Sequence, residues 1–374
     1  MKIAIFTPYN IFKSGGVQEH VQYQAKILRK RGHKVTILTP RPRLKTEADA
    51  PRGVVFLGSS ARIKAPHATH SDVSMTVDNE AVDAVLEKDY DIIHVHEPLS
   101  PIAARQILAR AAGKAVRIGT FHAALPGNTL GKSLVATYKT YARAVLPHVD
   151  VITAVSTASI GYIQDYTDLK INYIPNGIDK KKYKARKNGR DKNMVLFVGR
   201  LEKRKGARLA IKAFIELKKL NPEAKLKIAG DGPLRRSLQN YVRDMGIKDV
   251  EFLGYIDDKT KVDLFSRCGV YTSPALYGES FGIVLVEAMA MQAPIVAHPN
   301  DGYKWVLRDT GRLSLVDCKT PVAYAERMNL LMQDDELRKL WQKWAANYVK
   351  QFDYEKIVDA YEKLYKQALS KNDT

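Results

Sequence analysis

The sequence predicts an α/β protein of two Rossmann-like domains, each built on a parallel β-sheet, with the two sheets facing across a cleft. Short apolar runs alternate with amphipathic stretches of helical period along most of the 374 residues. No hairpin signal joins consecutive apolar runs, which favours parallel strands covered by helices on both faces. The length also exceeds the roughly 250–300 residues that one hydrophobic core usually serves. We therefore expect two domains.

The first domain is expected to span residues 1–178. It opens with the apolar strand KIAIFTP, a glycine turn at Gly15 and Gly16, an amphipathic helix that Gly32 ends, and a second strand, HKVTILTP. Further strands are expected at VVFLG, YDIIHVHEP, AVRIGTFH, DVITAVS and KINYIPNGI. Helical stretches such as SPIAARQILARAAG lie between several of them, as in a parallel α/β sheet.

The alternation pauses at 179–193, a polar and basic stretch that we interpret as a linker region between the domains. The pattern restarts with NMVLFVGRL, and a second α/β domain is expected over 194–352. Its other strands are expected at AKLKIAGDGP, VEFLGYI and CGVYTSP. From about residue 321 onward the chain is expected to be helical, with aromatic residues at the spacing of a packed core.

The composition limits the classes of function. Sixty basic residues against 40 acidic residues give a formal net charge of +20, which favours an anionic partner such as a phosphorylated substrate or an anionic lipid surface. The excess is spread over both halves, and no RNA- or DNA-binding signature is present, so nucleic acid is not an expected partner. Cys268 and Cys318 fit neither a disulfide framework nor a zinc pattern, and are expected to be buried free thiols. Because no apolar stretch is long enough to cross a bilayer, we expect a cytoplasmic protein, or one that lies on a membrane without spanning it.

Candidate binding residues follow the expected strands, because open parallel sheets bind ligands beyond the carboxyl ends of their strands. Gly15 and Gly16 precede a helix whose N-terminus favours anions, and glycine lets the backbone approach a ligand closely. His122 ends the strand RIGTFH, where its side chain would project into the cleft. A glycine turn without function and a structural histidine are the alternatives. His94 and His96 are expected to be structural.

The segment GRLEKRKG (199–206) is the second domain's counterpart of the glycine turn. It places Arg200, Lys203, Arg204 and Lys205 within one tight turn after a strand. Four cations at this spacing repel one another unless an anion neutralises them. A diphosphate suits them, since an arginine binds two oxygens at once while a lysine acts as a point charge.

Two glutamates flank an apolar run in the segment ALYGESFGIVLVEAMAMQAP. If a helix begins near Ser280, Glu279 lies at its N-terminus and Glu287 about two turns inside. An acidic side chain in an apolar segment is costly unless polar groups meet it. A carboxylate that accepts hydrogen bonds from two hydroxyls would bind the diol of a sugar or a ribose. The alternative is a capping Glu279 and a Glu287 without a binding role.

The motifs VSTAS, IPNGID, GRLEKRKG, AGDGP, FLGYID and E-x7-E occur in this order across the chain and resemble the retaining glycosyltransferases of the GT-B fold, family 4. The segments SGGVQEH, HVHEPLSP and GTFHA extend the resemblance to the N-terminal half. The resemblance implies a GDP- or UDP-linked sugar as donor, and neither a metal nor another cofactor. It also implies that a C-terminal helix, about 353–374, packs back on the first domain.

The resemblance assigns roles to the matching residues. His122 would line the pocket of the transferred sugar, Arg200 and Lys205 would hold the diphosphate and compensate the charge of the leaving group, and Glu279 would meet the sugar hydroxyls. These four are the expected catalytic residues. The residues expected to bind the donor, with Glu287 on the ribose, are Gly15, Gly16, Gly254, Tyr255, Ile256, Lys261, Ser280, Phe281, Gly282, Ile283 and Glu287.

Tyr9 and Arg62 would face the acceptor, where Arg62 suits the phosphate of a phosphoinositide. The sequence departs from the pattern of the resembling enzymes at four places. The stretch SDVSMTVDNE is not basic, although basic residues are usual there for membrane docking. Phe56 and Leu57 replace more polar residues beside the acceptor. Gln292 stands where glycine is usual, and HPNDGYKWVL replaces a glycine-rich turn.

The expected function is transfer of a hexose, of mannose or glucose type, to a lipid or small polyol acceptor, with phosphatidylinositol as the candidate lipid. No carboxylate is an obvious enzymic nucleophile, so attack on the same face, assisted by the leaving phosphate, is favoured. A sugar-nucleotide epimerase of the same architecture and a non-catalytic sugar-nucleotide-binding protein are the alternatives. Peripheral contact with an anionic membrane, at the inner face of the cell membrane, is also expected.

Overall fold

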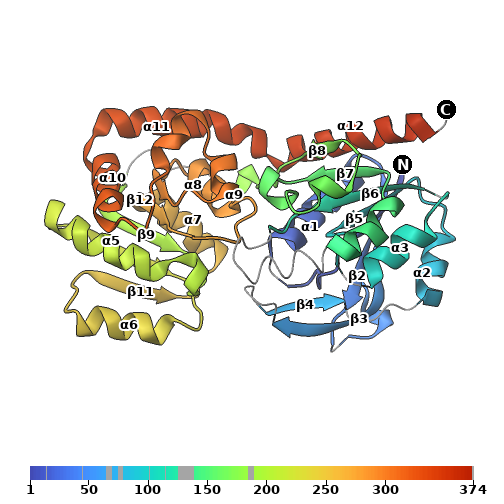
Figure 1. The fold of residues 1–374 in the computed structure, drawn as a ribbon, viewed down its shortest axis with the longest axis horizontal. Coiled ribbons are helices and arrows are strands. Elements are labelled where there is room, and N and C mark those ends of the chain that lie inside the picture. Colours follow the sequence, from blue (N-terminus) through green and yellow to red (C-terminus); the bar gives the residue numbers. More distant parts are fainter. Residues whose placement is uncertain are drawn as a thin grey trace. The chain divides into compact units, whose positions relative to one another are not determined.

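The computed structural model divides into two compact units (Figure 1). Unit 1 contains Met1–Gly177 and Tyr354–Thr374, and unit 2 contains Ile178–Asp353. The structure describes residues 1–13, 15–43, 45–64, 70–74, 79–100, 102–113, 115–124, 139–183 and 189–372.

Unit 1 is built on an eight-stranded sheet in the spatial order β4-β3-β2-β1-β5-β6-β7-β8. Every neighbouring pair is parallel except β3 with β4. The order reverses between β1 and β5, and this is the position at which doubly wound sheets bind ligands. The strands are β1 (Lys2–Phe6), β2 (Lys34–Arg41), β3 (Val54–Lys64), β4 (His70–Ser74), β5 (Ile92–His96), β6 (Val116–Phe121), β7 (Val151–Ala154) and β8 (Ile171–Tyr173).

Helices cover both faces of this sheet. Ile3 and Ile5 of β1 belong to one hydrophobic cluster with residues of α1 (Gly16–Lys30) and α12 (Tyr354–Asn372). Ala4 and Phe6 belong to another cluster with residues of α2 (Asn79–Leu86) and α3 (Ala103–Arg110). Alternate side chains of a strand point to opposite faces, so β1 is apolar from Ile3 to Phe6 because both of its faces are buried.

Unit 2 is built on a five-stranded sheet in the order β11-β10-β9-β12-β13, in which all neighbouring strands are parallel. Its main hydrophobic cluster joins the sheet to α5 and α10. The strands are β9 (Asp191–Val198), β10 (Lys225–Ala229), β11 (Val250–Gly254), β12 (Cys268–Ser273) and β13 (Ile295–Ala297). The helices are α5 (Ala207–Leu220), α6 (Arg235–Asp244), α7 (Asp258–Arg267), α8 (Ile283–Ala290), α9 (Asp301–Val306), α10 (Pro321–Gln333) and α11 (Asp335–Tyr348).

The predicted α/β class with two parallel sheets is confirmed. The expectation of parallel strands does not hold at one edge of the sheet of unit 1, where β3 and β4 pair antiparallel. The sequence between them lacks the Asn-Gly or Asp-Gly turn by which short hairpins are recognised. The expected linker region 179–193 also ends too late, since β9 begins at Asp191.

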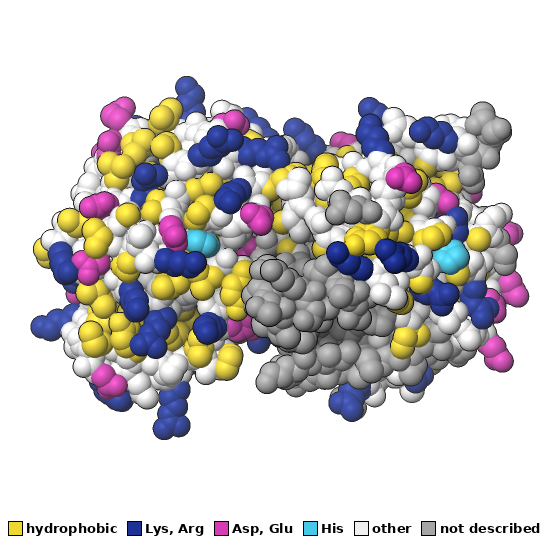
Figure 2. Space-filling view, viewed as in Figure 1, with side chains coloured by type: hydrophobic (Ala, Val, Ile, Leu, Met, Phe, Trp, Pro, Cys, Tyr) yellow, Lys and Arg dark blue, Asp and Glu magenta, His cyan; other side chains and the backbone are white. Residues whose placement is uncertain are grey.

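The expectation for the two cysteines is confirmed. Cys268 and Cys318 are free and buried. Within the ranges given above, no helix has both the length and the apolar character of a membrane span. On the face drawn in Figure 2, lysine and arginine side chains are scattered over the surface rather than gathered in one stripe.

Candidate functional site

The loop after β9 depends on a glycine. The 3₁₀ turn η6 (Lys203–Lys205) ends at Gly206, whose φ of 75° lies in the left-handed region. A Cβ added at Gly206 would lie 2.2 Å from the carbonyl oxygen of Pro274. The backbone N–H of Leu276 donates to the carbonyl oxygen of Arg204 at 2.8 Å. Glycine thus lets the loop after β9 lie directly against the loop after β12, its parallel neighbour.

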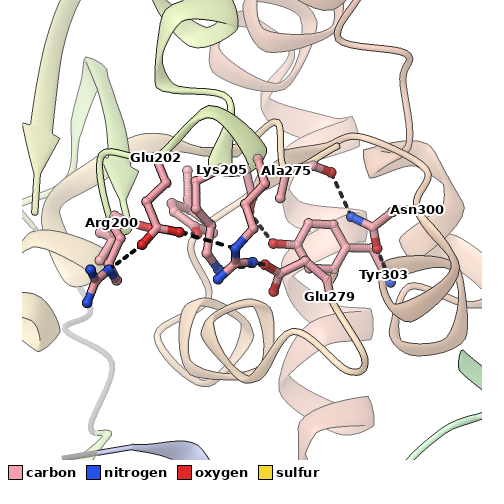
Figure 3. Close-up of polar contacts among 11 residues, drawn as sticks. Arg200, Glu202, Lys205, Ala275, Glu279, Asn300 and Tyr303 are labelled. Atoms are coloured by element: carbon pink, nitrogen blue, oxygen red, sulfur yellow. Dashed lines mark hydrogen bonds and ion pairs between the residues drawn. The ribbon is translucent and has the colours of Figure 1, made fainter. Parts of the chain in front are cut away.

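Charged side chains of these two loops form a chain of alternating sign (Figure 3). Arg200 Nε lies 2.6 Å from Glu202 Oε1, and Arg204 Nε lies 3.3 Å from Glu202 Oε2. Glu279 Oε1 accepts from Arg204 Nη1 at 2.7 Å and pairs with Lys205 Nζ at 2.6 Å. The side chain of Glu279 is only 9% exposed, against 47% for Arg200. The chain therefore runs from a buried carboxylate to an accessible guanidinium.

This arrangement relieves the repulsion expected among the four cations of the loop. Glu202 and Glu279 between them pair with three of the cations, and Lys203 is exposed, with no partner found among the residues that the structure describes. Four cations and two carboxylates leave a net charge of 4 − 2 = +2, so the loop pair still favours an anion. The partly exposed Arg200 and Lys205 are the cations best placed to meet one.

The backbone at Glu279 is held by the first turn of α9. Asn300 caps this helix by accepting from the N–H of Tyr303 at 2.9 Å, and its side-chain amide donates to the carbonyl of Ala275 at 2.8 Å (Figure 3). A Cβ added at Gly302 would lie 2.1 Å from the carbonyl oxygen of Glu279. Only glycine therefore fits where α9 meets Glu279.

The helix that carries Glu287 begins later than the expected start near Ser280. α8 starts at Ile283, because Gly282 adopts a left-handed φ of 89° as its N-cap. Phe281 is 2% exposed, and its ring packs 5.6 Å from that of Trp305, which makes it part of the hydrophobic interior. Glu287 is consequently about one turn inside the helix rather than two.

A second polar group surrounds Glu287, which is buried at 6% exposure. The Tyr183 hydroxyl donates to Glu287 Oε1 at 2.6 Å, and Lys261 Nζ donates to the same oxygen at 2.7 Å. Burial lowers the pKa of Lys261, but Glu287 and Asp258 outweigh burial and raise it overall. The ammonium is therefore firmly charged.

Gly254, Tyr255 and Ile256 follow β11 on the way to α7. Gly254 has a left-handed φ of 71°, and Tyr255 is 81% exposed. Asp257 then caps α7 by accepting from the N–H of Thr260 at 2.7 Å. An aromatic side chain this exposed at the carboxyl end of a strand is available for stacking against a ligand.

In unit 1, His122 directly follows β6 and is buried at 5% exposure. Its Nε2 lies 2.8 Å from Nδ1 of His96, and its backbone N–H donates to Oε1 of Glu97 at 2.9 Å. Burial lowers the pKa of His122 well below its usual value, and His20 and His94 lower it further. The imidazole is therefore neutral at physiological pH.

Buried histidines continue behind His122. His94 contacts the Tyr365 hydroxyl at 2.7 Å and the Thr120 hydroxyl at 2.6 Å, so its role is structural, as expected. Burial lowers the pKa of His94 to about 3 and that of His20 to about 4. Because Tyr365 belongs to α12, this polar core joins the C-terminal helix to the sheet of unit 1.

The remaining predicted residues of unit 1 lie near the N-terminus and in β3. Gly16 is the first residue of α1, and a Cβ added there would meet nothing within 4 Å, whereas a Cβ at Gly15 would meet the Gln18 side chain at 2.2 Å. Tyr9 accepts at its carbonyl from the Thr39 hydroxyl at 2.9 Å. Arg62 lies in β3, and its side chain is outside the described part.

One group in unit 2 has ligand types that metals use. His298, Asp317 and Cys318 bring one ligand atom each to within 4.8 Å of one another. Burial raises the pKa of the Cys318 thiol to about 12. Burial also lowers the pKa of His298, against the opposing effect of Asp317. We assign no metal to this group.

Several side chains that complete these clusters were not singled out from the sequence. The sequence pattern identifies Arg204 only as one cation among four, and it does not identify Glu202 or Tyr183. Glu97 directly follows β5, and burial raises its pKa to about 7 against the opposing N–H groups of His122 and Ala123. A carboxylate directly after a buried strand was the available signal.

The chain is similar to two family models and to individual proteins along most of its length. Residues 14–182 match the model described as Glycosyltransferase Family 4, and residues 179–348 match Glycosyl transferases group 1. The chain is 31% identical over 367 residues to the phosphatidyl-myo-inositol mannosyltransferase of Mycolicibacterium smegmatis, covering 95% of this chain and 90% of that protein. It is 30% identical over 379 residues to the protein of the same name from Mycobacterium leprae, covering 98% and 96%.

Solved structures match over nearly the whole chain. Sucrose-phosphate synthase from Thermosynechococcus elongatus has a TM-score of 0.74 at 20% identity, covering 99% of each chain. Anabaena Alr3699/HepE in complex with UDP-glucose has a TM-score of 0.72 at 20% identity, covering 98% of this chain and 100% of that chain. At this identity the likeness concerns the fold, which is the GT-B fold of glycosyltransferases.

Proposed function

Because this chain belongs to the family 4 glycosyltransferases, and is thus a sugar-transferring enzyme, we propose that it moves a hexose of mannose type from a nucleoside diphosphate sugar to phosphatidylinositol with retention at the anomeric carbon. The similarity to two proteins named phosphatidyl-myo-inositol mannosyltransferase supports the choice of sugar and acceptor. The contact of Glu279 with Arg204 and Lys205 supports the assignment of the reaction to unit 2.

The cations of the loop after β9 would stabilise the leaving group. Negative charge grows on the diphosphate as its bond to the anomeric carbon breaks, and preorganised cations in a partly buried site lower the energy of that state. Arg200 and Lys205 would hold the diphosphate without a metal. We expect the rate of transfer to be unchanged when EDTA is added, since the charge is compensated by side chains.

Glu279 would bind the sugar rather than attack it. Its carboxylate is already paired with two cations, which lowers its nucleophilicity and directs it toward hydroxyl groups. The acceptor oxygen would then form its bond to the anomeric carbon on the face that the phosphate leaves, and the acceptor proton would pass to a diphosphate oxygen. Isolation of a covalent glycosyl-enzyme would contradict this mechanism.

His122 would hydrogen-bond the transferred sugar. A neutral imidazole can hydrogen-bond a sugar hydroxyl without placing positive charge beside the developing oxocarbenium ion. Glu97 would support this role, since its carboxylate fixes the backbone of His122 at 2.9 Å.

The donor's nucleoside and the acceptor would occupy the remaining predicted residues. Gly254, Tyr255 and Ile256, with Lys261, would frame the base, and Glu287 would bind the ribose. Tyr9 and Arg62 would meet the acceptor. A net charge of +20 favours an anionic leaflet, at about 1 kcal/mol per nearby basic residue, and we propose that the enzyme works at the inner face of the cell membrane.

A thermal-shift panel of GDP- and UDP-linked hexoses tests the donor class. A ligand that binds only the folded protein raises the unfolding temperature by mass action. We expect one nucleotide series to stabilise the protein clearly over free hexose and inorganic phosphate. No shift with any nucleotide diphosphate sugar would contradict the proposed donor.

A further inference from the structure

Tyr183 lies far in sequence from the helix whose side chain it contacts. It follows the 3₁₀ turn η5 (Lys180–Lys182), near the start of unit 2, whereas Glu287 lies on α8. The phenol O–H donates to Glu287 Oε1 at 2.6 Å across 104 residues of sequence. A hydrogen bond to a buried carboxylate is strong, because the acceptor is charged and little water competes for it.

The two donors to Glu287 converge on one of its oxygens. Tyr183 and Lys261 both donate to Oε1, while Oε2 has no hydrogen-bond partner in the described part of the chain. Lys261 is itself held by Asp258 at 3.2 Å. The carboxylate is consequently fixed in one orientation, with one oxygen occupied and the other left as an acceptor.

An acceptor fixed in this way selects for hydroxyl groups. A ligand anion would meet the carboxylate charge, and an apolar group would leave Oε2 buried without a hydrogen bond, which is costly. A hydroxyl or a vicinal diol would satisfy Oε2 by donating to it. Sites built to hydrogen-bond a hydroxyl discriminate strongly against analogues that lack it.

We propose that Tyr183 is a specificity-determining residue, which orients Glu287 so that the enzyme distinguishes the ribose of a nucleoside diphosphate from a sugar without hydroxyls. This inference rests on the proposed function, because it takes Glu287 as the residue that meets the ribose. Tyr183 acts through Glu287 and is therefore a positioning residue.

The test measures binding of a ribonucleoside diphosphate and its 2′,3′-dideoxy analogue, with the base that the wild-type enzyme prefers, to wild type and to Tyr183→Phe. Phenylalanine keeps the ring and removes only the hydroxyl. The matched control is Tyr173→Phe, the same change at an exposed tyrosine of β8 in the other unit. Thermal unfolding of both variants checks that the fold is kept.

We expect Tyr183→Phe to weaken binding of the ribonucleotide about tenfold, since a hydrogen bond to a charged group is lost, and to leave binding of the dideoxy analogue unchanged. Tyr173→Phe is expected to change neither. Equal weakening of both nucleotides by Tyr183→Phe would show a merely structural role and overturn the inference, as would an unchanged preference for the ribonucleotide.

The proposed function fails separately from this inference. If the wild-type enzyme binds neither nucleotide, the donor class is wrong and the inference falls with it. If the wild type binds both nucleotides equally well, the donor class stands, but Glu287 does not read the ribose and the inference is overturned.

Discussion

Replacing Gly302 with alanine is expected to displace Glu279. The added Cβ would lie 2.1 Å from the Glu279 carbonyl oxygen and 2.8 Å from the carbonyl carbon of Ser280, where an ordinary contact needs at least 3.4 Å. The backbone at Glu279 or the first turn of α9 must therefore move by about 1.3 Å. Asn300 caps α9 and also holds the carbonyl of Ala275, so the strain falls on the loop that carries Glu279.

A displacement of this size has two measurable consequences. Overpacking of a tight contact costs about 1–3 kcal/mol of folding free energy. A catalytic group misplaced by about 1 Å lowers the rate by about 10²-fold. We expect Gly302→Ala to lower kcat/KM for sugar transfer by that factor and to lower Tm by several degrees.

The assay compares Gly302→Ala with Gly161→Ala by steady-state transfer and by thermal unfolding. A Cβ at Gly161 would meet only the Thr157 carbonyl oxygen, at an ordinary distance of 3.6 Å, so this control is expected to behave like the wild type. Normal turnover by Gly302→Ala would refute the claim that the position of Glu279 governs transfer.

Three further predictions concern the charged loop, the buried histidines and a thiol. Lys205→Ala is expected to lose about 10²-fold or more in kcat while the fold persists, and Lys203→Ala, an exposed cation of the same turn, is expected to lose far less, both measured by transfer assay. Burial depresses the pKa of His20 to about 4 and that of His94 to about 3, whereas an unfolded histidine has a pKa of 6.5. Below pH 6.5 the unfolded state therefore binds more protons at these histidines than the folded state does. The free energy of unfolding is therefore unaffected by these histidines above pH 6.5 and falls on acidification, by up to about 1.4 kcal/mol per pH unit for each histidine. Urea unfolding at several pH values will measure this decrease. Burial raises the pKa of Cys268 to about 12, and its thiol is expected to react with Ellman's reagent only after unfolding.

The architecture was predictable because it depends on periodic patterns. The alternation of apolar runs and amphipathic helices led to two parallel sheets. The rule that ligands bind beyond strand ends led to GRLEKRKG and Glu279, and the structure brings them into contact because β9 and β12 are parallel neighbours. The loops that follow neighbouring parallel strands lie at the same edge of the sheet.

Contacts between side chains far apart in sequence were not predictable in the same way. The hydrogen bond of Tyr183 to Glu287 joins residues 104 positions apart, and no periodic pattern in the sequence indicates it. The start of α8 was misplaced because Gly282 in the left-handed region, rather than a polar cap, begins the helix. Gln292 stands where glycine is usual in the resembling enzymes, and its φ of 53° lies in the left-handed region that glycine adopts at low cost. The usual glycine therefore indicates a backbone conformation at this position.

The paired cations and Glu279 are proposed to serve transfer of a hexose from a nucleotide diphosphate. The most direct measurement is NMR of the product formed by purified enzyme from a GDP- or UDP-hexose and phosphatidylinositol vesicles. We predict a hexosyl lipid whose anomeric configuration equals that of the donor. A product of inverted configuration, an epimerised donor, or no product from any donor would contradict the account.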